Sequence, residues 1–330
     1  MIYDCFSFFN ELDLLEIRLN VLKDVVDKFV LVEATRTHTG RPKPLYYEEN
    51  KARYAAFADR IIHVVVDDFS AAEGLPTVRE KAWAVENIQR NAIARGLIGA
   101  KPNDIIIISD LDEIPKPEAV RQAVGLPGVT RLGMKIYNYF LNLHDYSTSQ
   151  WMLATQVLSY GTFCNPLTYR GFEFGEFVIR SVNTCPSATM IRFLKSHRTF
   201  RNAGWHFSYL GGVEAIRNKV RSIAHTEFDT ERTVTDEWIK ARIAAGEDLF
   251  CRGDRCFADA IDETFPRYLR DNADRYARLI YPVDAAYLRK MRLAKFLYGL
   301  RGRIRGCVVK CVPSVLVPVL MRLRDRVHGV

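Results

Sequence analysis

Apolar residues in the first part of the chain follow two patterns. Short continuous apolar runs, bounded by polar residues, are typical of strands that are buried on both faces of a parallel sheet. Longer stretches, in which apolar positions recur with helical spacing, are typical of helices that pack on such a sheet. The two patterns alternate, which predicts a doubly wound α/β fold. The predicted strands are 2–6, 29–33, 61–66 and 105–108, and the predicted helices are 13–27 and 78–95.

The second half of the chain gives weaker signals for individual elements. Residues 140–200 are rich in aromatic side chains, but they show no regular period. We expect one folded domain over residues 1–288, followed by a separate tail over 289–330. Further strands are predicted at 132–139 and 190–194, and further helices at 213–223, 236–245 and 266–280.

The run of four isoleucines at 105–108 leads directly into the acidic residues Asp110, Asp112 and Glu113. Alternate residues of an extended chain face the same way, so Asp110 and Asp112 can converge on one point. That point would lie at the carboxyl end of a strand, where open α/β sheets bind ligands. Two carboxylates at this spacing suit Mg²⁺ or Mn²⁺ that already carries a diphosphate. The alternative interpretation is an acidic turn that faces solvent.

The formal net charge of +8 is unevenly distributed along the chain. Residues 289–330 contain eleven lysines and arginines but a single acid, Asp325. The preceding residues contain 36 basic and 38 acidic side chains, a net charge of −2. This balance excludes a nucleic-acid partner for the main domain on grounds of charge, because the basic residues are concentrated in the tail.

The seven cysteines are scattered, and their spacing lacks the second half of a zinc site. The first residues already have the pattern of a strand, without the basic and apolar regions of a signal peptide. Scattered thiols in such a chain predict a cytoplasmic protein in a reducing environment.

Six short motifs follow one another over roughly residues 3–282. They are 9–11 with 14–19, 26–30 with 37–44, 89–97, 109–115, 204–208 and 266–275. In this order the motifs resemble glycosyltransferase family 17. Animal members of that family carry a membrane anchor and a stem, which we do not expect in this chain. The resemblance therefore implies a microbial relative that works in the cytosol.

The resemblance implies a GT-A-type fold, in which a single Rossmann-like mixed sheet binds the nucleotide and is flanked by helices. It also implies an inverting, metal-dependent glycosyltransferase that uses a UDP-sugar, with N-acetylglucosamine as the family's sugar. Residues 1–130 would bind the nucleotide sugar, residues 131–288 would bind a glycan or lipid-linked glycan acceptor, and 289–330 would form a C-terminal helical extension.

Such a reaction needs a cation at the leaving diphosphate and a base at the acceptor hydroxyl. We expect Asp112 and Asp110 to bind Mn²⁺ or Mg²⁺, with His206 as a later ligand and His225 as its rival. For the donor, the candidates are Asn10 and Glu11 after the first strand, Glu33 at the end of the second, Arg90 and Asp110. The candidate bases are Glu227 and, second, Glu214. Trp205 is the candidate for stacking against an acceptor sugar.

The tail has the pattern of a basic amphipathic helix at an anionic membrane surface. Between Arg292 and Arg305, basic residues alternate with leucine and aromatic side chains. Residues 312–321 are apolar but too short to span a bilayer, and two prolines interrupt them. We therefore expect peripheral attachment to the inner face of the membrane, and the alternative is a terminal helix that covers the core.

Two other classes of function, a different enzyme and a non-catalytic binding protein, fit parts of the pattern. A phosphotransferase of the haloacid-dehalogenase type also has Asp-x-Asp after an apolar strand, but it needs Thr or Val where Ile114 stands. A sugar-nucleotidyltransferase would need a glycine-rich loop after the first strand, where this chain has Phe8-Phe9-Asn10-Glu11. A non-catalytic carbohydrate- or membrane-binding protein on a transferase scaffold is the second alternative.

Overall fold

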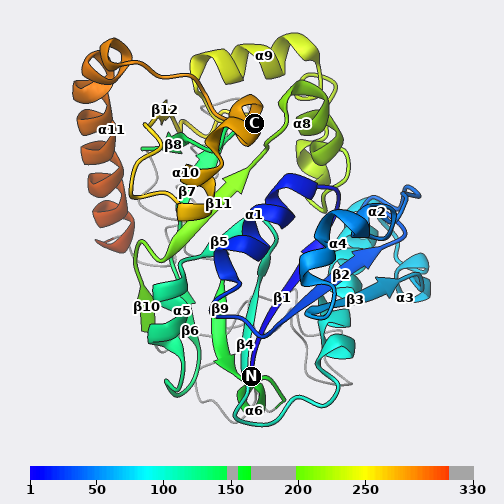
Figure 1. Ribbon diagram of the computed structural model, residues 1–330. Coiled ribbons are helices and arrows are strands. Elements are labelled where there is room, and N and C mark those ends of the chain that lie inside the picture. Colours follow the sequence, from blue (N-terminus) through cyan, green and yellow to red (C-terminus); the bar gives the residue numbers. More distant parts are fainter. Residues whose placement is uncertain (147–154, 165–197, 312–330) are drawn as a thin grey trace.

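The computed structural model describes residues 1–146, 155–164 and 198–311 of the 330-residue chain. It contains two mixed β-sheets flanked by helices (Figure 1), which confirms the predicted α/β class. The strands form two sheets, where the sequence pattern predicted a single one. The predicted strand at 190–194 lies outside the described residues.

The large sheet contains the strands predicted in the first part of the chain. Its strands are β1 (Ile2–Phe8), β2 (Lys28–Ala34), β3 (Ile61–Val66), β4 (Ile105–Asp110), β6 (Thr130–Leu132), β9 (Gln156–Ser159) and β10 (Arg198–Phe200). They run in the order β10-β6-β9-β4-β1-β2-β3. Strands β4, β1, β2 and β3 are parallel, whereas β9 is antiparallel to β4 and β6. The carboxyl ends of β1, β2 and β4 therefore lie at one edge.

The small sheet begins where β4 ends. It contains β5 (Glu113–Pro115), β7 (Lys135–Asn138), β8 (Leu143–Asp145), β11 (Gly204–Ser208) and β12 (Cys256–Ala258), in the order β12-β8-β7-β11-β5. The strand predicted at 132–139 is in fact two strands, because the chain passes from the large sheet to the small one between β6 and β7. The Asp-x-Asp segment thus lies at the seam of the two sheets.

Most predicted helices are present, and the main differences concern where they end. The α-helices are α1 (Leu12–Leu22), α2 (Tyr46–Asn50), α3 (Ser70–Glu73), α4 (Val78–Asn91), α5 (Pro117–Ala123), α6 (Tyr160–Cys164), α8 (Gly212–Val220), α9 (Asp236–Ala245), α10 (Arg267–Asp271) and α11 (Ala285–Cys311). Turns of 3₁₀-helix are Lys51–Phe57, Ala92–Leu97, Thr226–Phe228 and Ala273–Leu279. The capping box of Thr77 and Glu80 at the start of α4 is confirmed.

Helices cover both faces of the large sheet. Ile105 and Ile107 of β4 belong to the hydrophobic cluster around α1, whereas Ile106 and Ile108 belong to the cluster on the opposite face. The second cluster also contains Val85 of α4. This arrangement explains the unbroken apolar run, because every isoleucine of β4 faces a packed helix.

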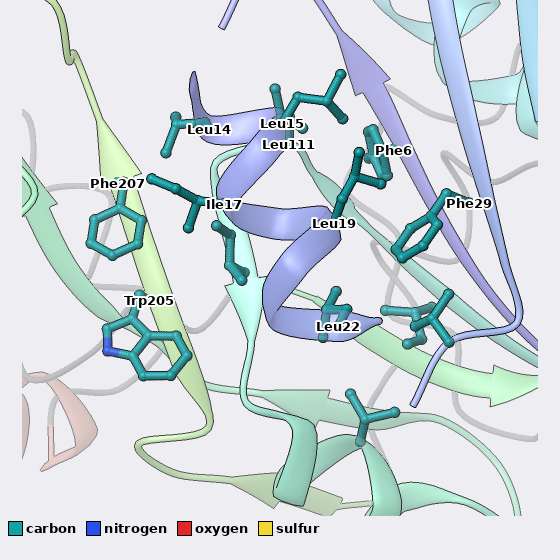
Figure 2. Packing of buried hydrophobic residues seen from close by; sticks show 14 of the residues in the cluster. Phe6, Leu14, Leu15, Ile17, Leu19, Leu22, Phe29, Leu111, Trp205 and Phe207 are labelled. Carbon is teal, nitrogen blue, oxygen red and sulfur yellow. The ribbon is translucent and has the colours of Figure 1, made fainter. Parts of the chain in front are cut away.

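Helix α1 joins the two sheets into one core. Figure 2 shows its leucine and isoleucine side chains between Phe6 and Phe29 of the large sheet and Trp205 and Phe207 of β11. Ile17 of α1 is fully buried within this cluster. The packing of α1 therefore fixes the position of β11 relative to the carboxyl end of β4.

Gly204 allows β11 to approach β5 closely. A Cβ atom added at Gly204 would lie 2.4 Å from the carbonyl oxygen of Ile114. Backbone atoms of a paired strand cannot move aside as a flexible side chain can.

We therefore predict that Gly204→Ala lowers the free energy of unfolding by about 3 kcal/mol, because the methyl group would overpack this pairing. A Cβ atom added at Gly74 meets no atom within 4 Å. Gly74→Ala should accordingly change the free energy of unfolding by less than about 0.5 kcal/mol. Urea unfolding of both variants tests this, and equal midpoints would contradict it.

Candidate active site

A buried arginine holds the Asp-x-Asp turn in place. The guanidinium of Arg18, on α1, donates from Nε and Nη2 to the two carboxylate oxygens of Asp4 on β1, at 2.7 and 2.6 Å. Its Nη1 donates to the carbonyl oxygens of Asp110, Leu111 and Glu113, at 2.9, 3.1 and 2.8 Å. Neither side chain of the Arg18–Asp4 pair is exposed to solvent. One side chain thus fixes the backbone that carries the acidic motif.

Asp110 and Asp112 do not share one extended strand. The chain turns at Leu111 and Asp112, so the two aspartates are not alternate residues of one strand as the sequence pattern predicted. The charge of Asp110 still acts on Asp112 and opposes the lowering of its pKa. Asp110 accepts from Arg90 Nη2 at 2.8 Å, and Arg90 also pairs with Glu86 at 3.0 Å. The turn therefore gives the two aspartates different cationic partners.

Asp112 lies between two groups from later parts of the chain. The antiparallel register places His206 of β11 opposite Glu113, and Phe207 N donates to Asp112 O at 2.9 Å. His206 Nε2 is 3.6 Å from Asp112 Oδ1, whereas Lys219 Nζ of α8 is 2.8 Å from Asp112 Oδ2. The two carboxylate oxygens therefore face different neighbours.

The charges of this group stabilise one another. Burial disfavours ionisation of Asp112, but Lys219 and His206 outweigh it and hold the pKa of Asp112 well below its usual range. Burial also opposes a charge on Lys219, yet Asp112 and Glu11 raise the pKa of that ammonium above its ordinary value. A carboxylate at residue 112 and an ammonium at residue 219 consequently coexist at neutral pH.

Lys219 also connects the Asp-x-Asp motif to the start of α1. Its Nζ is 3.7 Å from Glu11 Oε1, at the N-terminal end of α1, and 5.6 Å from the centre of the Tyr209 ring. Tyr209 has a φ of 56°, which is uncommon for a residue other than glycine. Such backbone strain persists where the surrounding structure over-determines it, and it clusters at functional sites.

Within the described residues, no group of three or more His, Cys, Asp or Glu side chains is arranged to hold a metal ion. Two protein ligands suffice for a cation that is also bound by a substrate diphosphate. Asp112 Oδ1 and His206 Nε2, 3.6 Å apart, provide a hard oxygen and an imidazole nitrogen, while Lys219 contacts the other carboxylate oxygen, Oδ2. This pair fits a divalent ion, and the imidazole favours Mn²⁺ over Mg²⁺.

Two residues that we expected to contact the donor or the acceptor are buried and have partners inside the protein. Glu33 is fully buried, and its carboxylate accepts from Tyr47 N at 3.1 Å and faces His63 Nε2 at 3.0 Å. Trp205 is 4% exposed, lies in the core around α1 (Figure 2) and donates from Nε1 to Thr264 O. Both side chains therefore have partners inside the protein, and their assignment to donor and acceptor binding stays a prediction.

The structure brings neither candidate base to Asp112. Glu227 pairs with His225 at 2.9 Å and lies 4.0 Å from Arg79, at the start of α4. Arg79 is roughly 16 Å along the helix axis from Arg90. Glu214 is exposed in the first turn of α8, roughly 140° around that helix from Lys219. Neither glutamate contacts Asp112 within the described residues, and their role as the base stays a prediction.

Arg18 and Lys219 were not identified from the sequence. Arg18 interrupts an apolar stretch between Ile17 and Leu19, and this was the available signal for a buried charge. Lys219 is one basic residue among several on a predicted helix, so its role depends on the position of α8.

Comparison with known proteins shows the family of this chain. The family model for glycosyltransferase family 17 matches residues 1–170, which include Arg18, Arg90, Asp110 and Asp112. The chain belongs to this family. Human beta-1,4-mannosyl-glycoprotein 4-beta-N-acetylglucosaminyltransferase is 32% identical over 82% of this chain and 53% of its own length.

Two further family relatives support the assignment. The rat enzyme of the same name is 30% identical, and the mouse enzyme 29%, each over 47% of this chain and 26% of its own length. The chain thus spans about half the length of the human relative and about a quarter of the rodent ones. Family membership argues against the haloacid-dehalogenase alternative.

We predict that Arg18→Met lowers the free energy of unfolding by about 4 kcal/mol, because it leaves Asp4 buried without its counter-charge. The double variant Asp4→Asn/Arg18→Met should recover part of this loss, since no uncompensated charge remains. Arg267 is a matched control because its side chain is 87% exposed. Denaturant unfolding measures all three, and an Arg18→Met effect no larger than that of Arg267→Met would contradict the prediction.

Proposed function

We propose that this protein is a metal-assisted, inverting glycosyltransferase. In this proposal it transfers N-acetylglucosamine from UDP-N-acetylglucosamine to a hydroxyl group of a glycan or lipid-linked glycan. The name of the human relative supports this sugar, and the family supports the reaction class. The observation that carries the proposal is the group of Asp112, His206 and Lys219 at the carboxyl edge of the large sheet.

This edge is where a nucleotide sugar is expected in an open α/β sheet. Asn10 and Glu11 follow β1 there, and Glu11 faces Lys219 across the start of α1. We infer that the nucleotide lies along this turn, with its diphosphate near Lys219 and the Asp112 carboxylate. A nucleoside diphosphate leaving group is stabilised there because fixed positive charge lowers the energy of the charge that develops on it.

The protein's own groups would divide this work. Asp112 and His206 would hold a divalent cation, which would act as a Lewis acid towards the diphosphate. Lys219 would orient Asp112 through Oδ2 and add a second positive charge. Arg90 would hold the Asp110 carboxylate in place at the end of β4. Arg18 would position the turn without touching the substrate.

A thermal-shift panel tests the donor and the metal together. We predict that UDP-N-acetylglucosamine with Mn²⁺ raises the melting temperature by a few degrees, because a ligand at about 100 times its Kd adds about 2.7 kcal/mol. Asp112→Asn should abolish the shift. An unchanged shift in Asp112→Asn, or a shift with none of the UDP-sugars, would contradict the proposal.

Substitution of the lysine tests its role in catalysis. We predict that Lys219→Met lowers kcat for sugar transfer or donor hydrolysis by on the order of 10²- to 10³-fold, the effect of losing one group that stabilises developing charge. Lys240→Met is the matched control, since Lys240 is 64% exposed on α9. Glu227→Gln should stay within a few-fold of the unmodified protein. A larger loss in Glu227→Gln than in Lys219→Met would restore Glu227 as the base.

A further inference from the structure

Helix α11 carries an apolar stripe on its outer surface. Leu293, Phe296, Leu297 and Leu300 are 66%, 60%, 52% and 41% exposed. Their spacing of three, four and seven residues places them on one face of the helix. Single exposed apolar residues are ordinary, but a continuous exposed stripe marks an interaction surface.

The opposite face of α11 is fixed to the small sheet. Lys295 donates to the carboxylate of Asp259 and to Ala258 O, both at 2.7 Å. The ring of Tyr298 contacts Phe257 of β12, with ring centres 5.5 Å apart. In Figure 1, α11 stands along one side of the molecule next to β12 and β8. These contacts hold the stripe outward, since they use the residues on the other side of the helix.

Basic residues flank the stripe, and the sequence of α11 itself contains no acidic residue. Arg289, Lys290 and Arg292 are all exposed. From 285 to 311 the sequence contains eight lysines and arginines but no aspartate or glutamate. An amphipathic helix of this kind lies in the interface of a bilayer, with its apolar face among the acyl chains and its basic residues at the headgroups.

We propose that α11 docks this protein on an anionic membrane surface through the stripe formed by Leu293, Phe296, Leu297 and Leu300. The charge of the helix selects the partner, because anionic lipid headgroups complement a helix that has only basic charges. The attachment is peripheral. Crossing a bilayer takes about 20 predominantly apolar residues in a row, and no helix within the described residues meets that requirement.

Co-sedimentation of the full chain with lipid vesicles tests this proposal. Phosphatidylcholine vesicles that contain phosphatidylserine should bind the protein, and binding should weaken as salt screens the headgroup charge. Vesicles of phosphatidylcholine alone should bind at least tenfold less. Arg289→Gln/Lys290→Gln/Arg292→Gln should weaken binding to the anionic vesicles by on the order of a hundredfold, because each basic residue near the surface contributes.

The stripe is tested by Leu293→Gln/Phe296→Gln/Leu297→Gln, which retains residues of good helix propensity. Binding should fall at least tenfold while the circular dichroism spectrum and melting temperature stay unchanged. Val78→Gln/Ile98→Gln is the matched control, because Val78 and Ile98 are 67% and 86% exposed away from α11. Equal binding of the stripe variant and this control would overturn the proposal. The proposal would also be overturned if the unmodified protein bound no vesicles and the stripe variant melted earlier or lost a dimer seen by size-exclusion chromatography. The stripe would then pack within the protein or against a second copy of it.

Discussion

The ion pair between Arg18 and Asp4 is the interaction on which the site depends. Burying two charges costs more than their mutual attraction returns unless further hydrogen bonds satisfy the remaining protons. Here the remaining donors of Arg18 are directed at the Ser109 hydroxyl and at the carbonyl oxygens of Asp110, Leu111 and Glu113. The cost of the buried charge is therefore tied to one geometry of the Asp-x-Asp segment, because a different turn would leave the guanidinium unsatisfied.

The same turn is also the seam between the two sheets. Its first residues end β4 in the large sheet and its last ones begin β5 in the small sheet, where β11 pairs with them. His206 and Lys219 come from distant parts of the sequence. They reach Asp112 because β11 pairs with β5 and α8 is the next element of the chain after β11. The close approach at Gly204 and the packing of α1 between the sheets keep that seam fixed, so stability and site geometry share the same contacts.

The sequence predicts the strands of the large sheet well because burial on both faces leaves an unbroken apolar run. It also singles out Asp112 and His206, which lie in distinctive local motifs and which the fold brings within 3.6 Å of each other; their role as metal ligands stays a prediction. It does not show which side chains become buried by tertiary contacts. Glu33 and Trp205 have the residue types of binding groups, yet each faces the interior. Lys219 shows the opposite case, because a lysine on a polar helix gives no local sign that a buried aspartate lies 2.8 Å away.

The division of Asp112 between its two oxygens bears on how the proposed site would accept a cation. Lys219 contacts Oδ2, and His206 faces Oδ1 at a distance beyond a normal hydrogen bond. A cation held by Oδ1 and the imidazole would leave the Lys219 contact in place. The ammonium of Lys219 and the cation would then both stabilise the charge of the diphosphate. Because Lys219 also faces Glu11, a change of charge at Asp112 would alter the contact between Lys219 and the start of α1. Donor binding and the geometry of the acidic turn would thus be coupled through a single side chain.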